Sequence, residues 1–493
     1  MPQSRLLRVS DLCFESAQTL AAQIAARELS CSELLEAFLA QIERLNPVVN
    51  AVVTLDAEGA RRSAHALDRA RPDPQQPLYG LPIAIKDLAM TRGMRTTMGS
   101  PIYRDFVPDF DELFVSRLRA AGAIIIGKTN TPEFGAGSQT FNPVFGATRN
   151  PYDTRLTCGG SSGGAAVALA CGMLPLADGS DLGGSLRNPA AFCNVVGFRP
   201  SPGRVPSWPK QFSSDALAVH GPMARSVGDL ALLLSAMAGP DSRVPVSLPE
   251  PGAVFRAPLA AAPAGARVAF SADLGGHPVA PEIAAVLEAT LPVFEDLGCR
   301  VSRAEPDLHD ADEIFRVLRA WMFLARSRQD YENHREQMKD TLVWNIEQGL
   351  ALTASDVAEA EIRRSALIAR VEAFFGDYDF LLCPVTQVAP FPVEQEWVRE
   401  INGIPMQSYL DWMGVCCDIT VTGLPAISVP AGFTAAGLPV GLQIVGRRWQ
   451  DLELLRFAHA FEQATGWARQ RPPLIDPHAS QHGGGVVLGD GDR

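Results

Sequence analysis

The residues best suited to chemistry in this sequence are two serines enclosed by glycines, in Gly-Gly-Ser-Ser-Gly-Gly (159–164) and Asp-Leu-Gly-Gly-Ser (181–185). The Ala/Val/Leu stretch between them, 164–171, is predicted to be a helix, so both loops can fold back to the same end of it. So many glycines indicate a backbone that turns sharply or approaches a ligand closely. Successive N–H groups along 181–185 could bind a developing oxyanion. The first motif alone also fits a flexible linker, but the neighbouring apolar helix argues against that interpretation.

A third candidate, Lys86, directly follows the apolar run 81–85, which is predicted to be a strand. A lysine at the end of a strand is usually a solvated charge, so Lys86 indicates little without the two serines. Burial behind the strand would lower the pKa of its amine, because desolvation disfavours the charged form.

Two further patterns match known motifs but lack the structural context that those motifs need. Residues 122–129 fit the phosphate-loop expression G-x-x-x-x-G-K-[ST], yet three isoleucines in its interior predict a strand rather than a loop. Residues 160–164 fit the G-x-S-x-G nucleophile elbow, but 151–158 is not the apolar strand that must precede it. The elbow also needs a downstream histidine, and the candidates without distinctive context are His220, His277, His309, His334, His459, His478 and His482.

The elements that must position these groups alternate between helices and short apolar strands. Residues 16–46 predict two helices, the second opening with the capping box 30–33, and 226–237 predict another capped helix. Strands are predicted at 81–85, 123–126, 268–270, 380–383 and 426–429. This alternation predicts an α/β protein with a buried sheet.

Three segments outside this pattern carry separate expectations. Residues 240–265 are rich in Pro and Ala and are expected to cross the surface, where they would mark a subdomain seam. Residues 310–375 are expected to be helical and to form a substrate lid or pocket wall. The polar, Gly-rich tail 477–493 is expected to be disordered.

Composition narrows the class of protein. The chain has 493 residues, of which 47% are hydrophobic and 20% charged, as in ordinary globular proteins. The formal net charge of −12 argues against a nucleic-acid partner, since phosphates must be neutralised by an excess of positive charge. The sequence shows neither a signal peptide nor an apolar run of membrane-spanning length, so a cytoplasmic location is expected. Nine scattered cysteines are expected to be reduced and mostly buried. The sequence contains no metal-binding Cys/His pattern, so we expect the protein to use no metal and no other cofactor.

Taken together, the motifs resemble those of the amidase signature family. The resemblance covers most of the chain, in the family's order, and rests on GLPIAIKD (80–87), GKTNTPEF (127–134), FGATRNPYD (145–153), the serine segment 158–206, GPMARSVGD (221–229) and GLPVGLQIVG (437–446). It implies one large domain over residues 1–476, with a central twisted mixed β-sheet covered by α-helices. It also implies amide hydrolysis without a cofactor.

The resemblance assigns a Ser-Ser-Lys triad to Ser185, Ser161 and Lys86. Ser185 would attack the amide carbonyl, and its proton would pass through Ser161 to Lys86, giving an acyl-enzyme that water hydrolyses. A neutral lysine at an unperturbed pKa near 10.4 costs roughly 4–5 kcal/mol at pH 7. Lys86 is therefore predicted to be buried, with a strongly lowered pKa.

The resemblance also assigns supporting roles around the triad. It implies a cis peptide between Gly160 and Ser161. Backbone N–H groups would form the oxyanion hole, from Leu182, Gly183, Gly184 and Ser185. Side chains expected to hold the two loops in register are Ser162, Asp181 and Arg187. Three positions depart from the family's commonest residues, and these are Asp178, Asn194 and Arg199.

Two functions remain open at this point. One is a stand-alone amidase acting on a small or aryl carboxamide, for which family habit implies a homodimer. The other resembles the A-type component of glutamyl-tRNA amidotransferase, which releases ammonia from glutamine within a complex. The sequence Thr-Pro-Glu-Phe at 131–134 resembles stand-alone amidases, whereas the amidotransferase component typically has Met-Asp-Glu-Phe there, so we favour the hydrolase. A third class, a nucleotide-binding protein, rests only on the pattern at 122–129.

Overall fold

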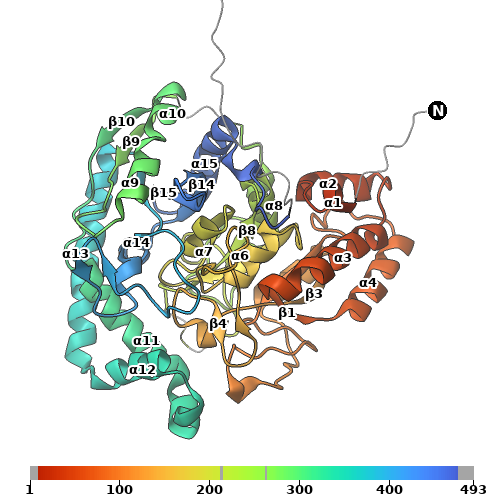
Figure 1. Ribbon diagram of the computed structural model, residues 1–493, viewed down its shortest axis with the longest axis horizontal. Coiled ribbons are helices and arrows are strands. Elements are labelled where there is room, and N and C mark those ends of the chain that lie inside the picture. Colours follow the sequence, from red (N-terminus) through yellow and green to blue (C-terminus); the bar gives the residue numbers. More distant parts are fainter. Residues whose placement is uncertain (1–8, 211, 213–214, 261–263, 476–493) are drawn as a thin grey trace, which may run out of the picture.

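The computed structural model describes residues 9–210, 212, 215–260 and 264–475, and its centre is an eleven-stranded sheet (Figure 1). The strands lie in the order β1-β3-β2-β6-β8-β7-β14-β15-β11-β9-β10. Their bounds are β1 Val52–Leu55, β2 Pro82–Lys86, β3 Ile124–Thr129, β6 Leu176–Asp181, β7 Val196–Arg199, β8 Val219–Ala224, β9 Arg267–Phe270, β10 Arg300–Arg303, β11 Phe380–Pro384, β14 Ala426–Phe433 and β15 Pro439–Gly446. Two short hairpins, β4 Phe141–Asn142 with β5 Gly146–Ala147 and β12 Glu400–Ile401 with β13 Ile404–Pro405, lie outside it.

The sheet is mixed, as predicted. Strand β2 runs parallel to both β3 and β6, and β9 runs parallel to β10 and β11. The strands between these two groups pair in antiparallel fashion, from β6–β8 through β7 and β14 to β15 and β11. Because β2 and β6 are parallel, their carboxyl ends reach the same edge of the sheet, where Lys86 and the Ser180–Asp181 pair lie.

Helices cover both faces of the sheet, since every residue of β2, β3 and β15 is buried. Helices α6 and α7 occupy the middle of the molecule and are buried at every position (Figure 1). The helices are α1 Val9–Leu12, α2 Ala17–Ala25, α3 Cys31–Val49, α4 Ala57–Arg69, α5 Leu113–Ala120, α6 Gly163–Ala170, α7 Arg187–Phe192, α8 Val227–Met237, α9 Pro281–Glu288, α10 Leu291–Asp296, α11 Ala311–His334, α12 Asp340–Ala351, α13 Ala354–Asp377, α14 Gly414–Thr422 and α15 Asp451–Thr465.

Local sequence signals explain where several helices begin. The Ser30 hydroxyl accepts from the Glu33 N–H while the Glu33 carboxylate accepts from the Ser30 N–H, so the predicted capping box starts α3. Helix α8 begins in a similar way, because the Ser226 hydroxyl accepts from the Asp229 N–H three residues later. Helix α6 reads Gly-Gly-Ala-Ala-Val-Ala-Leu-Ala, and its small side chains let it pack closely among β1, β2, β3 and β6. A Cβ at Gly164 would lie 2.3 Å from the Asn130 backbone nitrogen, which explains the glycine there.

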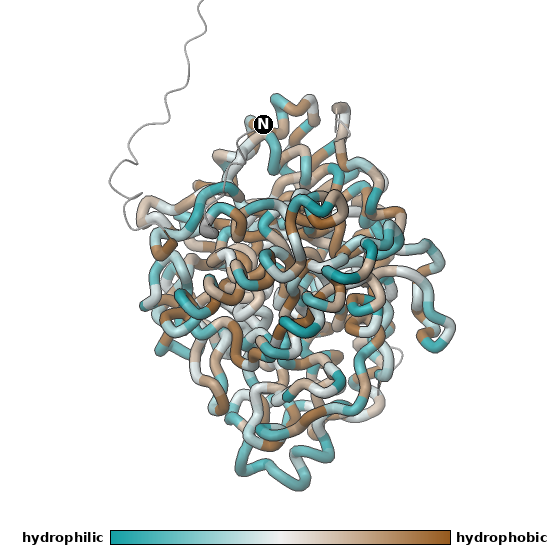
Figure 2. The backbone as a smooth tube through the Cα atoms, turned by 90° about the vertical axis from the view of Figure 1, so that its right-hand side faces the viewer, coloured by the Kyte–Doolittle hydropathy of each residue, from teal (hydrophilic) through white to brown (hydrophobic). Residues whose placement is uncertain are grey.

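The sequence predictions for the longer segments have mixed outcomes. Strands before and after 240–265 belong to the same sheet, so the expected subdomain seam at this crossing is wrong. The 310–375 region is helical as predicted, forming α11, α12 and most of α13. The tail 477–493 lies outside the described residues. Figure 2 shows hydrophobic stretches running through the middle of the molecule, with the projecting loops largely hydrophilic. Within the described ranges, no helix is long and apolar enough to cross a membrane.

Candidate active site

Lys86, the last residue of β2, makes three contacts with serine hydroxyls. Its Nζ lies 2.7 Å from Ser161 Oγ, 2.9 Å from Ser162 Oγ and 3.1 Å from Ser180 Oγ. The structure thus brings Lys86 and Ser161 together, which the sequence predicted only through the family resemblance. The contacts with Ser162 and Ser180 were missed: Ser162 was expected only to support the loop, and Ser180 lies in a polar segment that did not predict a strand.

The amine of Lys86 is fully buried, with 1% of the residue exposed. Burial lowers its pKa to about 7, even though Asp178 and Asp181 act in the opposite direction. The amine is contacted by three hydroxyls, and a pKa of about 7 leaves about half of it uncharged at pH 7. This state lets the nitrogen accept a proton from Ser161, as a general base must.

Asp178, one of the departures from the family's commonest residues, lies directly behind Lys86. Its Oδ1 accepts the Lys86 backbone N–H at 3.0 Å, and its Oδ2 has no hydrogen-bond partner among the described residues. Burial raises the pKa of Asp178, which favours the uncharged carboxyl. The negative charge of this carboxyl raises the pKa of Lys86, so Asp178 acts against the burial that lowers it.

The first serine loop is fixed by contacts to its backbone. The peptide bond between Gly160 and Ser161 is cis, as the resemblance implied. The Gly160 carbonyl accepts from Ser138 Oγ at 3.2 Å, and the Gly159 carbonyl accepts from Thr140 Oγ1 at 2.9 Å. The Ser162 N–H donates to the Ser185 carbonyl at 3.1 Å and so joins the two serine loops. Among the three candidate groups Ser185 is the most accessible, at 7% exposed against 2% for Ser161.

The second serine loop wraps around the carboxylate of Asp181. Its Oδ1 accepts the Gly184 N–H at 3.0 Å and its Oδ2 accepts the Leu186 N–H at 3.1 Å. The Gly184 N–H was predicted to be an oxyanion donor, but here it is used to hold the turn. Gly184 has a φ of +104°, which a residue with a side chain rarely adopts. Of the four predicted oxyanion donors, the N–H groups of Leu182, Gly183 and Ser185 are not bonded to Asp181.

Two buried arginines hold Asp181 in place. Arg187 Nη2 lies 2.9 Å from Asp181 Oδ1, and Arg199 Nη1 lies 3.3 Å from the same oxygen. Arg187 also donates to side chains far along the chain, Gln443 at 2.6 Å and Thr420 at 2.8 Å. Burial alone would raise the pKa of Asp181, but the two guanidinium charges and the backbone donors hold it well below its usual range.

We predict that Asp181→Asn lowers the free energy of unfolding by about 3–5 kcal/mol at pH 7, because it leaves two buried guanidinium groups without their counter-charge. Since the folded pKa of Asp181 is depressed, its contribution is present above the unfolded pKa, near 4, and is lost as pH falls below that value. Urea unfolding at pH 7 and pH 3 should therefore show a smaller difference between variant and wild type at pH 3.

A matched control is Asp153→Asn, which removes the surface ion pair with Arg155. This variant should unfold at nearly the same urea concentration as wild type, because exposed ion pairs contribute little to stability. An Asp181→Asn protein as stable as the control would contradict the structural role of the buried cluster.

Apolar side chains pack against the second serine loop. A Cβ at Gly183 would lie within 3.2 Å of Met413, Phe315 and Cys417 side chains. Leu182 and Phe134 pack on a separate hydrophobic cluster, whose buried members are Ala136, Met322, Phe323, Met338, Leu342, Val343 and Ile346. Most of that cluster comes from α11 and α12, so these helices lie beside the predicted oxyanion loop.

The phosphate-loop pattern at 122–129 and the nucleophile-elbow pattern at 160–164 both lack the structure that their motifs need. Residues 124–129 form β3, so Gly127, Lys128 and Thr129 belong to a strand rather than to a phosphate-binding loop. No named strand precedes Gly160 in 151–158, as the sequence indicated. His220 pairs with Glu112 at 3.4 Å and packs against Phe114. All nine cysteines are buried.

Comparison with known proteins now decides the family. The Amidase family model matches residues 33–455. The chain belongs to the amidase signature family. It is therefore an amidase, a hydrolase acting on amide C–N bonds, and its mixed sheet and helices form the fold of that family.

Three comparisons describe the relatives of this amidase. An acylamidase from Rhodococcus erythropolis is 38% identical over 463 residues, covering 93% of this chain and 97% of the relative. The A-type component of glutamyl-tRNA(Gln) amidotransferase from Thermus thermophilus is 38% identical over 481 residues, covering 93% and 99%. The crystal structure of a bacterial aryl acylamidase superposes with a TM-score of 0.87 at 29% identity, covering 94% of this chain and 99% of that one.

Proposed function

We propose that this amidase hydrolyses a small or aryl carboxylic amide through a serine acyl-enzyme, with Lys86, Ser161 and Ser185 as its triad. The observation that carries the proposal is the 2.7 Å contact between the buried Lys86 amine and the Ser161 hydroxyl. A buried lysine with a pKa of about 7 has no evident structural purpose in a cluster of hydroxyls, whereas a proton acceptor needs this state.

The proposed reaction has two halves that use the same proton path. Ser185 Oγ attacks the amide carbon while its proton passes to Ser161 and the Ser161 proton passes to Lys86. As the tetrahedral intermediate collapses, the C–N bond breaks and Lys86 returns the proton through Ser161 to the leaving nitrogen. Water then attacks the acyl-enzyme, again giving a proton to the lysine, and release of the carboxylate restores Ser185.

The developing oxyanion needs donors that are not already engaged. We assign them to the backbone N–H groups of Leu182, Gly183 and Ser185, because the Gly184 N–H is bonded to Asp181. Loss of one such donor typically raises the barrier by about 3–4 kcal/mol. Asp181 and Arg187 act as positioning residues, since they hold the turn on which these donors lie.

The surroundings of the loop support an apolar or aryl group on the substrate. Phe134 and Leu182 contact the cluster from α11 and α12, while Phe315 and Met413 lie beside Gly183. Aromatic and flexible apolar side chains are the usual lining of sites for small organic ligands. We therefore propose that α11 and α12 form the pocket wall expected from the 310–375 region.

The runner-up is an ammonia-releasing component of an amidotransferase complex, which the similarity to the Thermus thermophilus protein supports. We predict that the purified single chain hydrolyses simple anilides and aliphatic amides with no ATP, tRNA or second protein present. A panel of amides and esters followed by product chromatography measures this. Activity confined to glutamine, or dependent on added partner chains, would favour the runner-up instead.

The proposal requires no metal, other cofactor, nucleic acid or membrane, and the homodimer and cytoplasmic location remain expectations. Sedimentation velocity of the purified chain gives its oligomeric state. Dialysis against a chelator should leave amide hydrolysis unchanged.

A further inference from the structure

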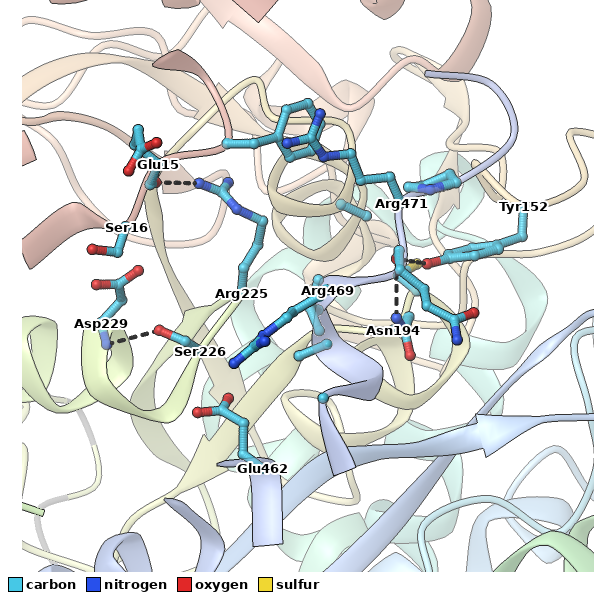
Figure 3. A pocket seen from close by; sticks show the side chains of 18 of the residues that line it. Glu15, Ser16, Tyr152, Asn194, Arg225, Ser226, Asp229, Glu462, Arg469 and Arg471 are labelled. Atoms are coloured by element: carbon cyan, nitrogen blue, oxygen red, sulfur yellow. Dashed lines mark hydrogen bonds between the residues drawn. The ribbon is translucent and has the colours of Figure 1, made fainter. Parts of the chain in front are cut away.

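A cavity of about 280 Å³ lies apart from the three candidate catalytic residues, none of which lines it. Segments distant in sequence line it, among them the residues just before α2, the turn after α7, the junction of β8 and α8, and the end of α15 with the segment that follows (Figure 3). Its lining mixes charged and polar side chains with apolar ones, whereas the surroundings of the second serine loop are apolar.

Three arginines line this cavity: Arg225, Arg469 and Arg471 (Figure 3). Arg225 is half-buried and donates to the backbone carbonyls of Leu174 at 2.8 Å and Glu15 at 3.0 Å. In the part of the chain that the structure describes, none of the three guanidinium groups has a carboxylate oxygen within ion-pair distance. The three guanidinium groups therefore line the cavity with no carboxylate in direct contact, although Glu15, Asp229 and Glu462 line it as well.

Two of these guanidinium groups share one aromatic ring. Arg471 lies 4.0 Å and Arg225 lies 5.4 Å from the centroid of the Phe14 ring. Burial lowers the pKa of Arg225; the negative charge of Asp229 acts against this, and the positive charge of Arg471 acts with it. The positive charge of Arg471 disfavours the charged form of Arg225, and a bound anion would offset that repulsion.

Three carboxylates also line the cavity, and the two buried ones are engaged elsewhere. Asp229 Oδ1 accepts the Gln18 N–H at 3.1 Å in α2, and Glu462 Oε1 accepts the Val227 N–H at 2.8 Å at the start of α8. The third, Glu15, contacts Arg225 through its backbone carbonyl. None of these bonds neutralises the arginines directly.

The segment that carries Arg469 and Arg471 is fixed by side chains beneath it. The carbonyl of Gln470, which lies between them, accepts from Tyr152 Oη at 2.9 Å and from Asn194 Nδ2 at 3.2 Å. Asn194 also donates to the Trp467 carbonyl at 3.0 Å. Asn194 therefore holds the arginine-bearing segment against the cavity.

We infer that this cavity is a binding site for a small dianion, such as inorganic phosphate or a four-carbon dicarboxylate. Arg225 binds it from the inner wall, and Arg469 and Arg471 bind it from the exposed rim. Guanidinium groups present paired N–H donors that match carboxylate and phosphate oxygens. The cavity lies near the lower limit of the volumes usual for organic ligands, which suits an anion of this size.

The test uses the full-length Ser185→Ala protein, so that the outcome is independent of the proposed catalytic function. Thermal unfolding is followed in sodium phosphate, sodium succinate and sodium chloride at equal ionic strength. Because a ligand that binds only the folded chain stabilises it, we expect a saturable rise in Tm of about 2–4 °C in phosphate or succinate. Isothermal titration then shows which of the two anions binds more tightly.

Two pairs of substitutions locate the binding. The double variant Arg469→Gln with Arg471→Gln removes the exposed rim charges. It should raise the Kd for the anion by at least about tenfold. Arg62→Gln with Arg300→Gln removes two exposed arginines from α4 and β10, and it should leave the rise in Tm unchanged. An equal rise in chloride, no rise in any salt, or an unaltered rise in the rim variant would overturn the assignment. Arg469→Glu gives a second, single-site check, with still weaker binding expected.

Discussion

Ser185→Ala is expected to lower kcat by at least about 10⁴-fold, because it removes the oxygen that forms the acyl-enzyme. The fold should be intact, since the bond that joins the two serine loops uses the Ser185 carbonyl rather than its hydroxyl. Incubation of wild type with a slowly hydrolysed aryl ester, followed by peptide mass spectrometry, should place the acyl group on Ser185. The variant should carry no such modification.

Ser365→Ala serves as the matched control, because this hydroxyl lies on an exposed face of α13 and donates within its own helix. Its kcat should equal that of wild type. If Ser185→Ala retained hydrolysis within tenfold of wild type while the circular dichroism of both variants was native, Ser185 would have no role as the nucleophile.

Lys86→Met is expected to lower kcat/KM by about 10³-fold or more, in line with the contribution of a general base. In wild type, kcat/KM should rise with pH through about 7 and then level off, because only the uncharged amine accepts the proton. This rise should be missing from the profile of the variant. An unchanged profile in Lys86→Met would contradict the assignment of Lys86 as the base.

Stability provides a separate readout for the same substitution. The pKa of Lys86 falls from 10.5 to about 7 on folding, so between these values the unfolded chain binds more protons and stability rises with pH. Below about pH 7 the buried amine costs stability, and Lys86→Met should unfold at a higher urea concentration than wild type.

Lys128→Met is the control for the pH–rate profile, because Lys128 is the other buried lysine of the sheet. This variant should keep the inflection near pH 7 in kcat/KM.

The sequence predicted the parts of the site that are written in contiguous motifs. The serine loops, the helix between them and the strand before Lys86 all have local signals, namely glycine clusters and apolar runs. Strand β6 was missed because Leu-Ala-Asp-Gly-Ser-Asp contains three polar residues, of which Asp178 and Asp181 are nevertheless buried. Its neighbour β8 contains His, Gly and Pro, and none of these is typical of a central strand.

Other features could not be predicted because they depend on contacts between distant segments. The engagement of the Gly184 N–H by Asp181 follows from the shape of one turn, which composition does not determine. The cavity with three arginines requires the chain after α15 to return beside α2 and α8. Neither the spacing of those arginines nor their number indicates that they line one cavity.

The bond from Arg187 to Gln443 spans 256 residues of sequence. When both serine loops have been synthesised, two partners of Arg187 have not yet been translated. These are Gln443 on β15 and Thr420 on α14. During synthesis, Asp181 and Arg187 must remain hydrated or borrow temporary partners until the last part of the sheet emerges. We therefore expect nascent chains of this enzyme to become active only after β14 and β15 have been translated and have docked.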